Sequence, residues 1–79
     1  MNVIWKGPAQ RDLRGIDPTH ARRILDAVDR FAATGQGDVK RLRGSDGIRL
    51  RVGDYRVRFV REGETIVVLH VDHRREAYR

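Results

Sequence analysis

Four arginines in the second half of the chain alternate with apolar residues on either side of Gly53-Asp54. They are Arg49, Arg51, Arg56 and Arg58. No acidic residue lies between Arg49 and Arg51 or between Arg56 and Arg58. A guanidinium group offers several N–H donors in a planar fork that fits the oxygens of a phosphate. Such donors also stabilise the charge that develops on a phosphoryl group during phosphodiester cleavage. The pattern therefore favours binding of a polyanion, either a nucleic acid or an acidic protein.

The alternation around Gly53-Asp54 is typical of a β-hairpin with a two-residue loop. With this loop Arg51 pairs with Arg56 and Arg49 pairs with Arg58, so that all four arginines share one face of the sheet. We call these four residues the arginine ladder. Each opposed pair of like charges costs about a few tenths of a kcal/mol in the free protein. An anionic ligand would offset that cost, whereas folding alone gives no reason for the arrangement.

The apolar partners in the same hairpin face the opposite side, where we expect the helices. They are Ile48, Leu50, Val52, Tyr55, Val57 and Phe59. A further strand is predicted over residues 65–71, because this run is apolar at nearly every position, as in a strand covered on both faces. A two-residue turn at Glu62-Gly63 would place Val67, Leu69, Val71 and His73 on the arginine side, and a loop one residue longer would reverse this.

Further candidate site residues lie beside the hairpin. Lys40 and Arg43 precede it in a glycine-rich segment, residues 35–47, which is predicted to be a loop. After the last strand, His73 offers proton transfer near neutral pH, Arg74 adds a cation, and Tyr78 offers a ring that stacks on a base.

The first half of the chain predicts the elements that carry this sheet. Val3–Trp5 is a short β-type run that suits an edge strand, and Pro8 opens a short helical stretch that Gly15 ends. Asp17-Pro18 is a helix start, and apolar residues then recur at helical spacing up to Gly35. The expected fold is α+β in the order strand, helix, helix and three antiparallel strands, with both helices on one face of a single domain over residues 1–79.

Composition narrows the classes of function. The net charge is +6, of which residues 1–39 contribute +1 and residues 40–79 contribute +5. The chain has no cysteine, which excludes disulfides and thiolate metal sites, and no apolar run approaches the roughly 20 residues of a membrane span. We therefore expect an intracellular, cytoplasmic protein that has no contact with membranes.

Three segments together resemble the RelE/ParE superfamily of toxins from type II toxin–antitoxin systems, and the RelE branch most closely. The segments are Arg41–Gly44, Arg49–Val57 and His73–Tyr78. The resemblance spans nearly the whole chain and implies a compact fold akin to small microbial ribonucleases. It also implies cleavage of mRNA in the ribosomal A site without a metal or cofactor, and neutralisation by a cognate antitoxin in a hetero-oligomer.

The resemblance assigns roles by position. Arg49 matches a basic catalytic residue, Arg56 the arginine that stabilises the transition state, and Arg74 an arginine near the leaving group. Tyr78 matches a tyrosine that stacks on the substrate, and His73 is a further catalytic candidate. Lys40, Arg43, Arg51 and Arg58 are predicted to bind RNA.

The sequence departs from the family pattern at three positions. Gly47 stands where some relatives have lysine, Arg49 replaces a lysine, and Asp72 stands where many relatives have glycine. Because a guanidinium hardly deprotonates, Arg49 suits a phosphate clamp better than a general base. Two alternatives remain open: inhibition of DNA gyrase, as in the ParE branch, and a catalytically inactive module that binds nucleic acid or antitoxin.

Overall fold

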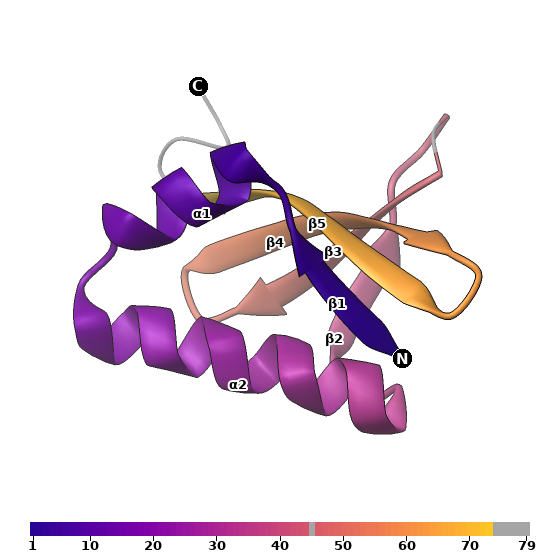
Figure 1. The fold of residues 1–79 in the computed structure, drawn as a ribbon, viewed down its shortest axis with the longest axis horizontal. Coiled ribbons are helices and arrows are strands. Elements are labelled where there is room, and N and C mark those ends of the chain that lie inside the picture. Colours follow the sequence, from indigo (N-terminus) through magenta and orange to yellow (C-terminus); the bar gives the residue numbers. More distant parts are fainter. Residues whose placement is uncertain (45, 74–79) are drawn as a thin grey trace.

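The computed structural model describes residues 1–44 and 46–73 of the 79-residue chain. Two helices cover one side of a five-stranded sheet (Figure 1). In chain order the elements are β1 (Asn2–Trp5), α1 (Gly7–Arg14), α2 (Pro18–Thr34), β2 (Asp38–Arg41), β3 (Gly47–Val52), β4 (Tyr55–Glu62) and β5 (Thr65–His73). The predicted α+β class, with both helices packed on one face, is confirmed.

The sheet has the strand order β1-β5-β4-β3-β2. All neighbouring strands are antiparallel except β1 and β5, which run parallel with Val3 opposite Ile66. The strand predicted at Val3–Trp5 does lie at an edge, but it makes the sheet mixed rather than purely antiparallel. The strand predicted over residues 65–71 is an interior strand between β1 and β4, in agreement with its apolar sequence.

The prediction of a loop over residues 35–47 is wrong at Asp38–Arg41, which forms β2 beside β3. The four residues of β2 are all exposed, and Val39 is the only apolar side chain among them. A short, charged strand of this kind is typical of a sheet edge, where charge discourages pairing with other chains. The sequence of β2 carries little strand signal of its own, and the strand forms because it pairs with β3.

Both helices begin and end where the sequence predicts. Pro8 lies in the first turn of α1, and Gly15 follows its last residue. In α2 the Asp17 side chain accepts a hydrogen bond from the backbone N–H of His20 at 3.3 Å, as an N-cap does. Gly35 ends the helix in the left-handed conformation with φ of 75°. No helix in the described part of the chain is long and apolar enough to cross a membrane.

The core lies between the helices and one face of the sheet. The buried residues of this core cluster come from both helices and from β3, β4 and β5, and they are Ala9, Ile24, Val28, Ala32, Leu50, Val57, Phe59, Ile66, Val68 and Val71. The Phe59 and Phe31 rings pack at a tilt, with centroids 5.3 Å apart, and join the central strand to α2. The helix-facing side of the hairpin is thus buried as predicted, which leaves the opposite face for the arginines.

The hairpin turn is the local feature that sets this arrangement. Gly53 has φ of 59° and no non-glycine residue in the described chain has positive φ, so Gly53 alone carries the left-handed conformation of the turn. Positive φ at the first of two loop residues is typical of a type II′ turn, whose twist matches that of the strands.

We expect Gly53→Ala to lower the free energy of unfolding by about 1–2 kcal/mol, the cost of a left-handed conformation for a residue with a Cβ atom. No atom lies within 4 Å of the added Cβ, so the effect is purely conformational. Urea denaturation measures the change, with Gly7→Ala as the control because that position also has open space and no positive φ. Equal stability of the two variants would contradict this account of the turn.

Candidate nucleic-acid interface

The hairpin register brings the four arginines together as predicted. Arg51 lies opposite Arg56 and Arg49 lies opposite Arg58 on β3 and β4, while Leu50 and Val57 pair on the buried face. The four arginine side chains therefore lie on the face of the sheet that the helices do not cover. Their geometry as a single surface is confirmed, whereas their individual chemical roles stay predictions.

β2 extends this surface. Lys40, which was predicted to lie in a loop, is opposite Arg49 and so joins the arginine face, while its contact with RNA stays a prediction. Asp38 lies opposite Arg51 at the same edge and brings a carboxylate to the rim of the surface. Arg43, another predicted RNA-binding residue, is exposed in the connection between β2 and β3 rather than on a strand.

A β-bulge in β5 changes which residues of that strand reach the arginines. Arg58 lies opposite His70 but the next residue, Phe59, lies opposite Val68, so Leu69 is an extra residue on β5. Up to the bulge the alternation puts Val67 on the arginine face. Beyond it, the alternation is inverted.

Because of this inversion, part of the prediction for the strand over residues 65–71, now β5, is wrong. The turn consists of Gly63-Glu64 rather than Glu62-Gly63, and Val67 lies on the arginine side in either case. Val71 and His73, however, lie opposite Val57 and Tyr55 and face the helices, so their expected place on the arginine side is wrong. His70 and Asp72 take that side instead.

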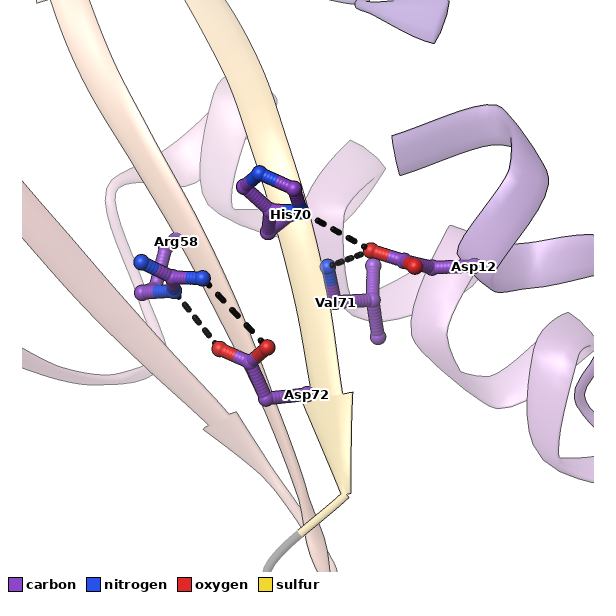
Figure 2. A network of polar contacts seen from close by, with 5 residues as sticks. All are labelled: Asp12, Arg58, His70, Val71 and Asp72. Atoms are coloured by element: carbon purple, nitrogen blue, oxygen red, sulfur yellow. Dashed lines mark hydrogen bonds and ion pairs between the residues drawn. The ribbon is translucent and has the colours of Figure 1, made fainter. Parts of the chain in front are cut away.

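Asp72 forms an ion pair with the ladder. The Arg58 Nε donates to Asp72 Oδ2 at 2.6 Å, and Nη2 donates to Oδ1 at 3.4 Å (Figure 2). Asp72 also lies directly opposite Arg56 in the sheet. The absence of an interleaved acid is therefore true of the hairpin alone, because β5 supplies Asp72 on one side of it and β2 supplies Asp38 on the other.

Asp12 of α1 anchors the same end of β5. Its Oδ2 accepts a hydrogen bond from the backbone N–H of Val71 at 2.9 Å and lies 3.3 Å from Nδ1 of His70 (Figure 2). β1 pairs only with residues 65–68 of β5, so the edge of β5 beyond them would expose backbone donors. The Asp12 carboxylate satisfies one of these donors and ties α1 to the strand that carries Asp72.

Two other ladder arginines differ in their local contacts. The Arg51 Nε donates to the backbone oxygen of Gly53 at 3.3 Å, which orients an otherwise exposed side chain beside the turn. Arg49 Nε is buried and finds no hydrogen-bond acceptor within the described residues. A hydrogen bond from this donor to an oxygen atom of a ligand would be favourable, because a buried donor without a partner costs about 1–3 kcal/mol.

His73 belongs to a cluster of rings on the helix side. It packs edge-on against Tyr55, with ring centroids 4.9 Å apart, and Tyr55 lies 5.7 Å from the ring of His20 on α2. The sheet thus separates His73 from the arginine ladder, and its predicted catalytic role gains no support from this placement. Arg74 and Tyr78 lie outside the described residues. In the part of the chain that is described, no group of three His, Asp or Glu side chains could hold a metal ion.

The contribution of Asp72 to the surface was missed from the sequence. The residues before it, Ile66–Leu69, are all apolar, so the alternation that would reveal a bulge is absent. A single extra residue reverses the face of every residue after it. No residue type in the run marks Leu69 as that extra residue.

Comparison with solved structures finds several toxin–antitoxin complexes of similar fold. A RelB–RelE complex from Methanococcus jannaschii contains a chain with a TM-score of 0.80 and 24% identity, over 95% of this chain and 94% of that one. A RelE–RelB complex from Pyrococcus horikoshii OT3 gives 0.79 and 27%, over 92% and 93%. The RelBE2 complex from Mycobacterium tuberculosis gives 0.63 and 32%, over 92% and 96%.

The sequence comparisons give one family. No curated protein matches the chain. The family model described as the ParE toxin of the type II toxin–antitoxin system parDE matches residues 3–78. This match spans the sheet, both helices and every residue of the arginine ladder, and the RelE structures share the same fold. The chain therefore belongs to the ParE toxin family, within the RelE/ParE superfamily of type II toxins.

Proposed function

We propose that this toxin cleaves mRNA in the A site of the ribosome and thereby stops translation. The observation that carries the proposal is the arginine ladder, in which Arg49 and Arg51 oppose Arg58 and Arg56 on the sheet face that the two helices do not cover. The like charges within these pairs repel each other, and the Asp72 carboxylate beside Arg58 offsets part of that repulsion in the free protein. An RNA backbone presents closely spaced phosphates, which would turn the same arrangement into a set of attractive contacts.

The proposed chemistry needs no metal. The 2′-hydroxyl of the RNA attacks the adjacent phosphorus, the bond from phosphorus to the 5′-oxygen breaks, and a 2′,3′-cyclic phosphate and a 5′-hydroxyl result. Negative charge grows on the non-bridging oxygens, where preorganised guanidinium donors stabilise it. Arg56 is proposed to supply the main stabilisation, and Arg49 to clamp the phosphate through the donors of its guanidinium group.

The remaining cations are proposed to hold the RNA strand. Lys40 and Arg51 lie beside the two proposed catalytic arginines and are exposed, so they suit contacts to neighbouring phosphates. Arg43 would extend this track into the loop. Arg74 near the leaving group and Tyr78 as a stacking residue stay proposals from the family resemblance alone.

Inhibition of DNA gyrase is the second candidate, because the matching family model is that of ParE toxins. The two activities leave different products. Toeprinting of a message during translation with added toxin should reveal new 5′ ends within A-site codons if the ribonuclease proposal holds. Gyrase-linked DNA breaks without such ends would favour the second candidate, and neither product would indicate an inactive binding module.

We also propose a cognate antitoxin as a cytoplasmic partner. The RelE chains from Methanococcus jannaschii and Pyrococcus horikoshii come from complexes with RelB, and the cationic face that the helices of this chain do not cover suits an acidic segment. Expression together with the product of the adjacent gene should yield a stable hetero-oligomer that dissociates more readily at high salt. Recovery of the toxin alone under those conditions would contradict the proposal.

A further inference from the structure

We infer that Asp72 limits the affinity of the arginine ladder for RNA, because its carboxylate occupies the Arg58 donors that a phosphate would otherwise bind. This inference rests on the proposed function. It adds a residue that opposes RNA binding to the set of cations proposed to support it.

The first support is the geometry of the ion pair. Two donors on one edge of the Arg58 guanidinium, Nε and Nη2, meet the two oxygens of the Asp72 carboxylate at 2.6 and 3.4 Å. This two-point contact is the arrangement that a guanidinium also makes with two oxygens of a phosphate. A phosphate and Asp72 therefore compete for the same edge of Arg58.

The second support is the position of the carboxylate among the charges. Asp72 lies directly opposite Arg56, and its partner Arg58 lies directly opposite Arg49. A negative charge here lies directly beside Arg56 and Arg58, so it weakens the attraction of these two arginines for any phosphate that approaches. The side chains of Arg58 and Asp72 are 43% and 27% exposed, so solvent and RNA can reach the pair.

The third support is the structural origin of the contact. The bulge at Leu69 places Asp72 on the arginine face; an unbroken alternation would direct it toward the helices. Asp12 then fixes this end of β5 through its hydrogen bond to the Val71 N–H. The strand register and the contact with α1 thus fix the backbone at Asp72, so that its side chain is directed to the arginine face.

Salt dependence of RNA binding provides a specific test. The probe is a short, fluorescently labelled single-stranded RNA with 2′-O-methyl groups, which cannot be cleaved through the 2′-hydroxyl. Each phosphate neutralised by the protein contributes about −0.7 to the slope of log K against log salt concentration for a single strand. We expect Asp72→Asn to steepen this slope by about 0.7, because Arg58 then binds phosphate. At low salt its affinity should rise about fivefold, the effect of one unit charge at about 4 Å in water.

Two further variants make the test decisive. Asp29→Asn changes the net charge equally on the exposed surface of α2, and it should leave the slope unchanged. The double variant Arg58→Gln with Asp72→Asn removes an internally neutral pair, so it should return the slope to that of the wild type. It also keeps the inference testable if Asp72→Asn alone folds poorly, which a thermal unfolding curve would reveal.

The outcomes separate the two claims. Wild-type binding that is salt-dependent, together with equal slopes for Asp72→Asn and Asp29→Asn, would overturn the inference and leave the proposed RNA-binding face intact. A double variant with a slope shallower than that of the wild type would overturn it as well, because Arg58 would then already bind phosphate. A wild-type protein that shows no salt-dependent binding to RNA would overturn both the inference and the proposed function.

Discussion

Replacement of Arg56 by alanine is expected to lower the rate of mRNA cleavage by about 10²–10³-fold, the usual effect of removing one preorganised donor to a developing oxyanion. Arg56 lies on the central strand, opposite Arg51 on one side and Asp72 on the other. Its guanidinium is thus at the centre of the proposed phosphate surface. Quantitative primer extension on a translated message, over a series of times and toxin concentrations, measures the rate.

Arg61→Ala is the matched control for this variant. Arg61 lies on the same strand but opposite Ile66, so it faces the other side of the sheet, and its Nε donates to the backbone oxygen of Gly63. Removal of this exposed cation should change the cleavage rate by only a small factor. A full cleavage rate in Arg56→Ala, or an equal loss of rate in both variants, would show that a place on the arginine face has no bearing on cleavage.

Phe59→Ala is expected to lower the free energy of unfolding by about 3–5 kcal/mol. Phe59 is only 2% exposed and packs on Phe31, so truncation leaves a cavity at the contact between β4 and α2. A small domain has a total stability of about 5–15 kcal/mol, so this loss removes a large share of it. Urea denaturation followed by circular dichroism measures the change.

Ile4→Ala provides the comparison for the core variant. Ile4 is 50% exposed on the edge strand β1, and its truncation should cost about 1 kcal/mol or less. The arginine ladder needs the folded sheet. Under conditions in which the Phe59→Ala variant is unfolded, it should therefore also bind RNA more weakly. Equal stability losses in the two variants would contradict the placement of the core between α2 and β4.

Local sequence signals account for most of the fold. Asp17 with Pro18 starts α2, Gly35 ends it, and Gly53 sets the hairpin; each acts through the backbone conformation of a few adjacent residues. β2 could not be predicted in this way. Its four exposed residues form a strand because they pair with β3, and that long-range contact leaves no periodic apolar pattern in their own sequence.

The same distinction between local signals and long-range pairing applies to the candidate site. The pairing of Arg51 with Arg56 follows from the turn, because two adjacent strands and one loop length determine it. The partner of Arg58 on the next strand does not, because one extra residue at Leu69 exchanges the faces of β5. This exchange replaces His73 by Asp72 near the ladder, which turns an expected proton-transfer group into a carboxylate that pairs with Arg58.

The central claim, that the arginine ladder is the surface that binds RNA, is tested most directly by NMR of the arginine Nε–H groups during titration with a short single-stranded RNA. We expect the resonances of Arg49, Arg51 and Arg56 to shift with increasing RNA, while those of Arg22 on α2 and Arg61 on the opposite face of the sheet stay in place. Larger shifts at Arg22 and Arg61 than at the ladder would contradict it.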